Sequence, residues 1–290
     1  MTAGDAMPAD AGTLYVVATP LGNLRDVTLR ALDILASVDV IAAEDTRVTA
    51  RLLARHGIAA RALSLHRHNE ARRAREIVAL LGEGRSVALV TDAGTPAVSD
   101  PGAKLVRAVM TAGHPVVPLP GPNAAVAALS ASGIEASHWL FCGFLPASPA
   151  ARQAELERLR DAPCALVFYE APHRIAATLA TLGAVLGGER EIVIARELTK
   201  RFESIHRCAL GDAPAWLAAD PDRARGEFVL IVDAPLPSEP AASETARDRM
   251  LSALLAELPL AQAVRLAVAL SGRPRNELYA RALALAKQTS

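Results

Sequence analysis

Short apolar runs alternate with longer segments of helical period, and this alternation constrains the fold more than any other feature of the sequence. The runs are rich in valine, leucine and isoleucine, and they lack the apolar–polar alternation of a strand with one face in water. They predict parallel strands buried on both faces, with helices packed on either side. In the first half of the chain the predicted strands are residues 14–18, 38–42, 62–65, 87–90 and 116–119, and the predicted helices are residues 29–36, 47–56, 71–81 and 103–112, with another after Pro122.

The pattern restarts at His138, where strand follows strand more often and helical segments are fewer. This change predicts a second, α+β domain on a mixed sheet. Its predicted strands are residues 139–142, 165–169, 192–195, 203–208 and 227–232. Further on, predicted helices at residues 250–256, 260–270 and 275–286 form a small appendage, and Gly272 and Pro274 mark a turn compatible with a helix-turn-helix.

The sequence therefore divides into five predicted parts. They are a disordered tail (1–13), an N-terminal α/β domain (14–133), a C-terminal α+β domain (134–233), a linker (234–246) and a helical appendage (247–290). The linker is predicted from its composition, because it holds three prolines, two glutamates and two serines.

Charge and cysteine content exclude several classes of protein. The 31 lysines and arginines equal the 31 aspartates and glutamates, so the chain lacks the uniformly basic surface that binds nucleic acid at no particular site. The three cysteines lie far apart, which excludes a disulfide framework and a Cys-x-x-Cys zinc site and favours a reducing cytoplasm. No apolar segment resembles a signal peptide or a membrane span, so no membrane partner is expected. His66 and His68 make a weak metal pattern, and no metal is expected.

Loops rich in glycine, proline and polar residues follow four of the predicted strands, at residues 19–23, 91–102, 120–123 and 170–173. In open α/β sheets, ligands bind outside the carboxyl ends of the strands, so loops from two domains predict a cleft between them. Glycine and proline also serve simply to turn a chain. The loop at 91–102, however, exceeds the two to six residues that a turn needs, and its two carboxylates and three hydroxyls favour binding. No Gly-x-Gly-x-x-Gly or P-loop motif occurs at these strands, which excludes the common dinucleotide and phosphate sites.

Six motifs occur in a fixed order along the chain. They are Thr19-Pro20-Leu21-Gly22-Asn23-Leu24, Ala43-Glu44-Asp45-Thr46-Arg47, residues 91–102, residues 119–123, residues 168–174 and Arg196-Glu197-Leu198-Thr199-Lys200. Together they resemble the tetrapyrrole-methylase superfamily of S-adenosylmethionine (SAM) enzymes, and within it the enzymes that methylate a cytidine 2′-hydroxyl in 16S rRNA. The resemblance covers about residues 14–232, with a weaker match at Asn276-Glu277-Leu278-Tyr279.

The resemblance implies a two-domain class III SAM methyltransferase of the α/β class with a C-terminal helical appendage. It further implies a homodimer that acts on 16S rRNA or the 30S subunit, and SAM bound in the cleft between the domains. The residues implied to contact SAM are Pro20, Gly22, Asp92, Ala93, Gly94, Ser99, Gly121, Pro122, Asn123, Tyr169 and Glu170. Independently of the resemblance, a sulfonium cation favours carboxylates and aromatic faces, which Asp92 and Tyr169 offer.

A basic segment lies between Thr46 and Glu76, with eight arginines and two acids. Three of the arginines share one face of a predicted helix, where each like-charged pair costs about 0.2 to 0.5 kcal/mol. The segment is either a solvated face or, with the resemblance, a surface for RNA phosphates. The predicted RNA contacts are Arg47, Arg51, Arg55, Arg72 and Arg73. Residues 241–290, with seven basic and four acidic residues, give a weaker signal of the same kind.

Methyl transfer to a ribose hydroxyl needs a group that removes a proton. Arginine stays charged, whereas a buried lysine gives up its proton readily. The chain has 28 arginines and only three lysines, so Lys200 is a candidate base, in competition with Glu197, Glu44, Asp45 and Glu170. An exposed Lys200 without a role also remains open.

Two other functions remain open, a SAM-dependent methylase of a tetrapyrrole (precorrin-like) substrate and a ribosome-associated binding protein without catalysis. The basic appendage favours RNA over a small macrocycle.

Overall fold

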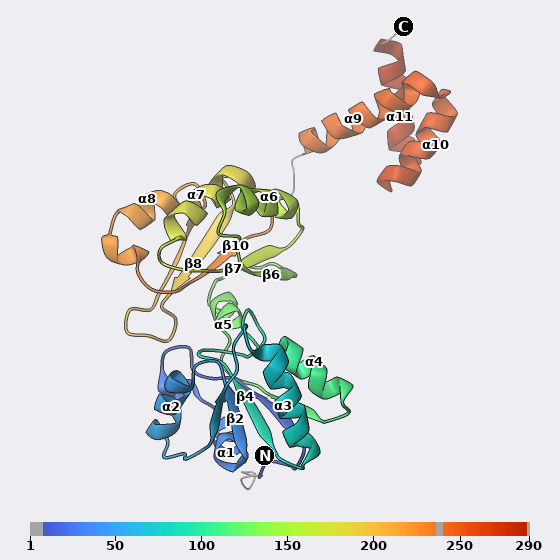
Figure 1. Ribbon diagram of the computed structural model, residues 1–290. Coiled ribbons are helices and arrows are strands. Elements are labelled where there is room, and N and C mark those ends of the chain that lie inside the picture. The colour runs from blue at the N-terminus through green and yellow to red at the C-terminus, as the bar shows by residue number, and fades with distance from the viewer. Residues whose placement is uncertain (1–7, 236–239, 289–290) are drawn as a thin grey trace, which may run out of the picture. The chain divides into compact units, whose positions relative to one another are not determined.

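The computed structural model describes residues 8–235 and 240–288. Contacts divide the chain into two compact units, Met1–Ala234 and Pro235–Ser290. Among the described residues, the first unit contains two five-stranded sheets and the second contains three helices (Figure 1).

The first sheet is parallel and has the strand order β3-β2-β4-β1-β5. Its strands are β1 (Leu14–Val17), β2 (Val40–Ala43), β3 (Ala62–Ser64), β4 (Val87–Val90) and β5 (Val116–Leu119). Every residue of β2 and β4 is buried, which explains why these strands appear in the sequence as unbroken apolar runs. All five strands were predicted, with ends that differ by no more than two residues.

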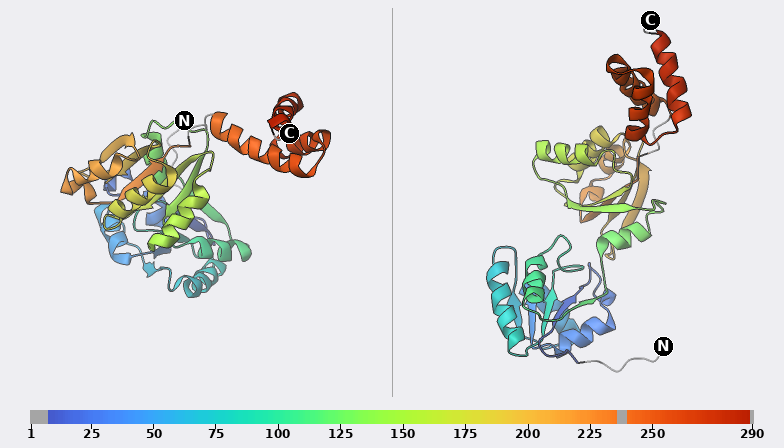
Figure 2. Two further views of the ribbon diagram at one scale, coloured as in Figure 1. Left: turned by 90° about the horizontal axis from the view of Figure 1, so that it is seen from above. Right: turned by 90° about the vertical axis from the view of Figure 1, so that its right-hand side faces the viewer.

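Helices cover both faces of the first sheet, as the right-hand view of Figure 2 shows. One face packs against α1 (Leu29–Ser37) and α2 (Thr46–Arg55), and the other against α3 (Glu70–Gly82) and α4 (Ala103–Thr111). Polar side chains fix where two of them begin. Thr28 accepts a hydrogen bond from the Ala31 N–H at 3.1 Å, and Asp45 accepts one from the Arg47 N–H at 2.8 Å. A single 3-10 turn, η1 (Leu24–Asp26), precedes α1.

The second sheet is mixed, as predicted, and has the order β6-β7-β10-β8-β9. Its strands are β6 (Trp139–Phe144), β7 (Ala165–Glu170), β8 (Glu191–Arg196), β9 (Ser204–Ala209) and β10 (Phe228–Val232). Because β10 runs antiparallel to both β7 and β8, it begins at the edge where those two strands end. One face is covered by α6 (Pro149–Leu159), α7 (Ile175–Leu186) and α8 (Ala213–Ala218), and η2 (Pro221–Ala224) precedes β10.

Helix α5 (Ala124–Ser130) links the two sheets. It follows β5 of the first sheet, yet Ala125 and Ala128 pack against β7, β8 and β10 of the second. The Tyr169 hydroxyl accepts a hydrogen bond from the Ala125 N–H at 3.2 Å, which fixes the first turn of the helix to β7. In Figure 1 the helix lies between the two sheets.

The second unit consists of α9 (Pro240–Glu257), α10 (Leu260–Ser271) and α11 (Arg275–Gln288). Its core contains Leu251, Val264, Ala267, Leu278 and Ala282. Gly272 ends α10 in the left-handed conformation with φ of 65°, which glycine adopts without steric cost.

The structure places two ends differently from the predicted boundaries. Of the predicted tail, residues 1–7 lie outside the described residues, whereas residues 8–13 are held because the N–H groups of Ala9 and Asp10 donate to the Ser37 and Tyr15 hydroxyls. Of the predicted linker, residues 236–239 lie outside the described residues, and α9 begins at Pro240, because proline is well tolerated in the first turn of a helix.

No described helix has the length and apolar character required to cross a membrane.

Candidate active site

A cavity of about 420 Å³ lies where strands of the two sheets end. The first sheet contributes the loops after β1, β2, β4 and β5, and the second contributes the ends of β6, β7 and β8 together with the start of β10. The residues that line it are Leu21, Glu44, 91–95, 98–100, Asn123, Ala124, Phe144, 169–172, Ala195, Leu198 and 227–229. All four loops that the sequence singled out contribute residues to this cavity.

The loops after β1 and β4 are joined directly, because these strands are neighbours at the centre of the sheet. Thr19 and Gly94 exchange two backbone hydrogen bonds of 2.9 Å, and the Thr19 hydroxyl donates to the Thr91 carbonyl oxygen at 2.9 Å. The connection after β1 runs along the sheet toward β2, and the connection after β4 runs the opposite way, toward β5. In open α/β folds, ligands bind at the point where two neighbouring strands have connections in opposite directions.

The loop after β4 holds an unusual backbone conformation. Ala97 and Ser99 have φ of 66° and 69°, a region that residues other than glycine seldom adopt. Contacts from the segment before and at the start of α3 hold the loop there. Arg67 donates to the Ser99 carbonyl oxygen at 2.7 Å, and buried Glu70 accepts the N–H groups of Gly102 and Lys104 at 3.0 Å each. Such conformations persist where the surroundings enforce them, and they concentrate at functional sites.

The first-sheet side of the cavity is acidic. Glu44 accepts a hydrogen bond from the Thr91 hydroxyl at 2.6 Å, and Asp92 accepts one from the Asp45 N–H at 3.0 Å. Burial, with the negative charges of Glu44 and Asp92, raises the pKa of Asp100 to about 6. Burial also raises the pKa of Asp92. A cation in the cavity would offset the cost of holding three carboxylates so close together.

The second-sheet side is mainly apolar and aromatic. The Tyr169 ring makes edge contacts with Phe141 and Phe144, at centroid distances of 4.9 and 5.7 Å. Burial raises the pKa of the Tyr169 hydroxyl, so it remains neutral. The cavity therefore combines an acidic wall with an apolar one, which suits a ligand that carries both a cation and a flat apolar group.

The turn between β8 and β9 contacts the loop after β1. The Asn23 N–H donates to the Thr199 hydroxyl at 3.2 Å, and the stem of Lys200 lies where a side chain on Gly22 would stand, 2.4 Å from a Cβ there. The Lys200 Nζ donates to Glu197 and Glu227 at 2.9 Å each. Gly22 is therefore required by packing against Lys200, and the ion triad holds the turn in place.

Comparison with known proteins identifies the family. The family model described as Tetrapyrrole (Corrin/Porphyrin) Methylases matches residues 13–214, which is more than half of the chain. The chain belongs to the tetrapyrrole methylase family. A second family model, described as the RsmI C-terminal HTH domain, matches residues 241–286, the region of α9 to α11.

Relatives within the tetrapyrrole methylase family match nearly the whole chain. The ribosomal RNA small subunit methyltransferase I of Escherichia coli O157:H7 is 48% identical over 272 residues, 94% of this chain and 95% of that protein. The protein of the same name from Vibrio cholerae is 47% identical over 286 residues, 96% of this chain and 97% of that protein. The resemblance predicted from the motifs is confirmed, and the chain is a methyltransferase.

Solved structures show the same fold. The uroporphyrin-III-C-methyltransferase of Thermus thermophilus aligns with a TM-score of 0.54 at 23% identity, covering 77% of this chain and 94% of that one. A cobalt precorrin-4 methyltransferase aligns with a TM-score of 0.57 at 18% identity, covering 76% and 94%. The predicted fold class, a tetrapyrrole-methylase-like α/β fold with a helical appendage, is confirmed.

Most of the residues predicted to contact the methyl donor of the family line the cavity. They are Asp92, Ala93, Gly94, Ser99, Asn123, Tyr169 and Glu170. The other four predicted residues, Pro20, Gly22, Gly121 and Pro122, are not among the residues that line it. Gly121 packs against Ala18, whose Cβ lies 2.8 Å from where a Cβ on residue 121 would stand. The Pro122 carbonyl oxygen accepts a hydrogen bond from the Thr95 hydroxyl at 3.0 Å. Pro20 and Gly22 flank Leu21, which is the residue of that loop that lines the cavity.

The Glu170 carboxylate is buried and already bonded within the protein. It accepts hydrogen bonds from the Thr178 hydroxyl at 2.6 Å and from the Ala171 N–H at 2.9 Å, and it lies 3.1 Å from the Arg174 Nε. Its side chain is 1% exposed. This carboxylate holds β7 to α7 and has little capacity left for a ligand.

The other four of the five predicted candidate bases fall in different environments. Glu44 lines the cavity. Hydrogen bonds from Arg47 hold the pKa of Asp45 at about 2, so that carboxylate is a weak base. Burial opposes the charged form of Lys200, but its bonds to Glu197 and Glu227 outweigh this and raise the pKa of Lys200 above its ordinary value. Burial raises the pKa of Glu197, but the hydrogen bonds from Lys200 and the Glu227 N–H, together with the charges of Lys200 and Arg196, outweigh it and the net shift is downward.

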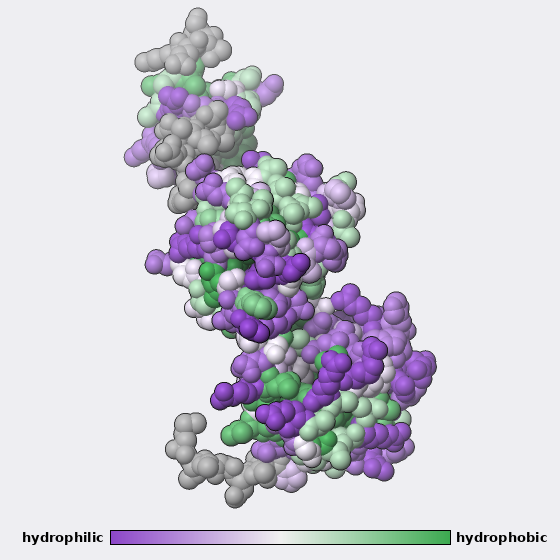
Figure 3. Space-filling view, turned by 90° about the vertical axis from the view of Figure 1, so that its left-hand side faces the viewer, coloured by the Kyte–Doolittle hydropathy of each residue, from purple (hydrophilic) through white to green (hydrophobic). Residues whose placement is uncertain are grey.

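The predicted RNA-binding arginines differ in how far they are engaged. Arg51 and Arg55 are exposed on α2, and no described carboxylate pairs with them. Arg47 pairs with Asp45 and Arg72 with Glu76, both at 2.6 Å. Arg73 is half-buried and donates to the Ser64 carbonyl oxygen at 3.2 Å, so part of its role is structural. Figure 3 shows the side on which α2 lies in Figure 1, where hydrophilic side chains cover much of the surface around the first sheet, next to a hydrophobic area.

Two acidic residues of the cavity escaped the sequence prediction. Asp100 lies in the 91–102 loop, which was predicted to bind a ligand. It is the second carboxylate of that loop after Asp92, and this was the signal that could have identified it. Glu227 had no local signal, because it reaches the site only through the antiparallel placement of β10.

Asp100→Asn is expected to raise the melting temperature of the ligand-free protein by a few degrees at about pH 8 and to leave it nearly unchanged at about pH 4. The pKa of about 6 in the folded state exceeds the ordinary value of 3.8, so the folded chain holds this proton more tightly than the unfolded chain. The stability from protonated Asp100 is complete below pH 3.8 and is lost as the pH rises through 6. Melting curves of both proteins from acid to neutral pH measure this, and a difference that is constant with pH contradicts it.

Proposed function

We propose that this methyltransferase transfers the methyl group of SAM to the 2′-hydroxyl of a cytidine ribose in 16S rRNA, in the cytoplasm. The observation that carries the proposal is the cavity with its acidic and aromatic walls. The substrate class rests on relatives such as the 48% identical protein named ribosomal RNA small subunit methyltransferase I.

The cavity fits SAM in charge and polarity. Asp92 and Asp100 would hold its cationic groups, and Tyr169 and Leu198 would contact its apolar parts. The pKa of Asp100 is raised by burial and by the nearby charges of Glu44 and Asp92, and a positively charged ligand would offset both effects. When bound, SAM supplies a methyl group on a positively charged sulfur that departs as a neutral thioether. We propose direct contacts for six of the seven predicted residues that line the cavity, and a supporting role for the seventh, Glu170, and for Pro20, Gly22, Gly121 and Pro122.

The chain must also accept the proton that the ribose hydroxyl loses. We propose Glu44 for this role, because it lines the cavity and its Oε1 has no hydrogen-bond partner among the described residues, while Oε2 is occupied by Thr91. Asp45 is tied to Arg47, which disfavours it. The bonds around Lys200 favour an ammonium, so Lys200 and Glu197 are proposed to position the turn between β8 and β9.

Lys200→Arg is expected to retain methyl transfer within about threefold of the wild type, whereas Lys200→Ala is expected to lose about tenfold, mainly through KM. Arginine keeps the positive charge that pairs with Glu197 and Glu227, and it cannot act as a base. Single-turnover rates on the RNA substrate measure the difference. If Lys200→Arg is as inactive as Lys200→Ala while SAM binding is intact, the positioning role is wrong and a lysine base is required.

For the RNA, we propose phosphate contacts from Arg47, Arg51, Arg55, Arg72 and Arg73 on α2 and α3. Arg51 and Arg55 support this, because they are exposed and pair with no described carboxylate. Arg47 and Arg72 form surface ion pairs, which contribute little stability, so these two arginines can exchange their carboxylate partners for phosphates. The second unit, which matches the C-terminal helix-turn-helix model, is proposed to add a further RNA contact. Arg73 contributes less, because it also supports β3.

We also propose a homodimer of chains in which residues 14–133 and 134–233 act as separate domains. Trp139, Leu140 and Phe144 lie on the edge strand β6 and are 42%, 42% and 52% exposed. An edge strand with large exposed apolar side chains is normally covered by a partner, which supports the dimer.

The proposed activity is tested by mapping ribose methylation in 16S rRNA by mass spectrometry, in cells with and without this protein. Loss of one 2′-O-methylcytidine, restored by the wild-type protein, is the expected result. Unchanged rRNA methylation, or a methyl group lost from a base, would overturn the proposal. A tetrapyrrole substrate predicts unchanged rRNA and an affinity that depends little on salt, because few phosphates would be bound.

A further inference from the structure

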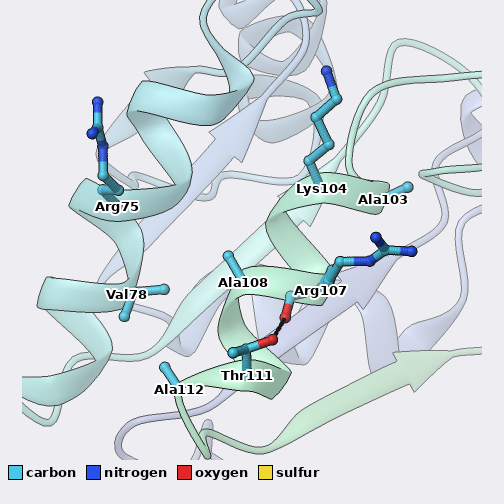
Figure 4. Close-up of a pocket in the computed structure, with 8 residues that line it drawn as sticks. All are labelled: Arg75, Val78, Ala103, Lys104, Arg107, Ala108, Thr111 and Ala112. Carbon is cyan, nitrogen blue, oxygen red and sulfur yellow. Dashed lines mark hydrogen bonds between the residues drawn. The ribbon is translucent and has the colours of Figure 1, made fainter.

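A second concave surface lies between α3 and α4 and shares no residue with the cavity. It has a volume of about 730 Å³ and an apolar floor that includes Val78 and Ala108. Figure 4 shows Arg75 extending from α3 and Lys104 from α4 beyond the helices in a similar direction, while Arg107 reaches to the other side of α4. There Arg107 and the exposed Met110 line a further shallow pocket. We call this surface, defined by Arg75, Lys104 and Arg107, the α3–α4 groove.

The three basic side chains are exposed and lack acidic partners. No ion pair joins Arg75, Lys104 or Arg107 to a described carboxylate. Glu76, the nearby acid of α3, is already engaged by Arg72 and Arg73. Lys104 and Arg107 are three residues apart on α4, which places like charges side by side on one helix. The groove is therefore a local concentration of positive charge in a chain with no net charge.

The groove is connected to the active site through the loop after β4. Both helices follow parallel strands, so both begin at the edge of the sheet where the cavity lies. Lys104 is the second residue of α4, and Glu70 of α3 binds its N–H. Arg67, just before α3, donates to the carbonyl oxygen of Ser99, which lines the cavity. Basic groups thus continue from the cavity edge at Arg67 to the groove.

We infer that the α3–α4 groove binds the phosphodiester backbone of the substrate RNA outside the cavity, with phosphates on Arg75, Lys104 and Arg107. This inference rests on the proposed function and adds a path for the strand beyond the residues predicted on α2 and on the first turn of α3. Guanidinium and ammonium groups without acidic partners suit phosphate oxygens. The apolar floor and Met110 offer surface for a sugar or a base.

The test compares the wild type with the triple variant Arg75→Gln, Lys104→Gln, Arg107→Gln in binding to a 16S rRNA fragment over a range of salt concentrations. Each lost phosphate contact is expected to make the negative slope of log affinity against log salt concentration shallower by about 0.7 to 0.9. Three lost contacts therefore make it shallower by about 2.1 to 2.7 and weaken binding about 100- to 500-fold at 0.1 M salt. SAM affinity and melting temperature are expected to stay at wild-type values, because none of the three residues lines the cavity.

Two control variants sharpen the test. Arg75→Lys, Lys104→Arg, Arg107→Lys keeps the charges and is expected to keep the slope. Arg158→Gln removes an exposed arginine from α6 of the second sheet and is expected to change nothing. If the triple glutamine variant binds the RNA fragment as tightly as Arg158→Gln does, the inference is overturned. It is also overturned if the triple variant loses binding to the 30S subunit but keeps binding to the RNA fragment, because the groove would then bind an acidic protein segment. Failure of the proposed function is distinguishable, because the wild type would then show no salt-dependent RNA binding at all.

Discussion

Glu44→Gln is expected to lower the single-turnover rate of methyl transfer about 100-fold, because a general base contributes about 10²- to 10⁴-fold to a reaction that needs proton removal. The glutamine amide oxygen can still accept the hydrogen bond that the Thr91 hydroxyl makes at 2.6 Å, so the site should keep its shape. SAM affinity should change only severalfold, since Asp92 and Asp100 remain. The variant removes the group proposed to take the proton and little else.

A matched control variant provides the second readout for Glu44. Glu83→Gln, an exposed acid at the end of α3, is the matched control and should behave as the wild type. A Glu44→Gln rate within threefold of the wild type would remove Glu44 from the mechanism.

Glu170→Ala is expected to destabilise the first unit by about 3 to 5 kcal/mol, the cost of breaking a buried ion pair from one side. The change leaves Arg174 without its carboxylate partner and deprives the Thr178 hydroxyl and the Ala171 N–H of their acceptor. For a unit of this size, that loss corresponds to a decrease in melting temperature of about 10 °C. Thermal or urea unfolding of the full chain measures it.

Glu170→Gln and Thr178→Val separate the contributions to this effect. The glutamine variant keeps an acceptor for Thr178 and loses the charge, so an intermediate loss is expected. Thr178→Val removes one hydrogen bond and should cost about 1 kcal/mol. If Glu170→Ala instead leaves stability unchanged but abolishes SAM binding, this carboxylate serves the ligand, and the structural role assigned to it is wrong.

The first sheet could be predicted closely because its strands are buried on both faces. Runs such as Val87–Val90 contain no polar residue, and their ends coincide with the loops that turn toward the cavity. The start of α9 at Pro240 was harder to predict, since prolines and serines nearby have the composition of a linker, while proline is also well tolerated in the first turn of a helix.

The candidate site could be predicted where loops follow parallel strands, and less well elsewhere. Asp92 and Tyr169 stand at strand ends that the sequence identifies. Glu227 lies at the start of β10, and only the antiparallel pairing with β7 brings it there. The role expected of Lys200 depends on its two carboxylate partners, one of which lies 27 residues away.

A crystal structure of the protein soaked with SAM decides whether SAM binds in the cavity between the two sheets. We predict density for SAM in contact with Asp92, Asp100 and Tyr169. Density for SAM on another surface, or an empty cavity in crystals of protein that methylates RNA in solution, would show that this cavity is not the SAM site.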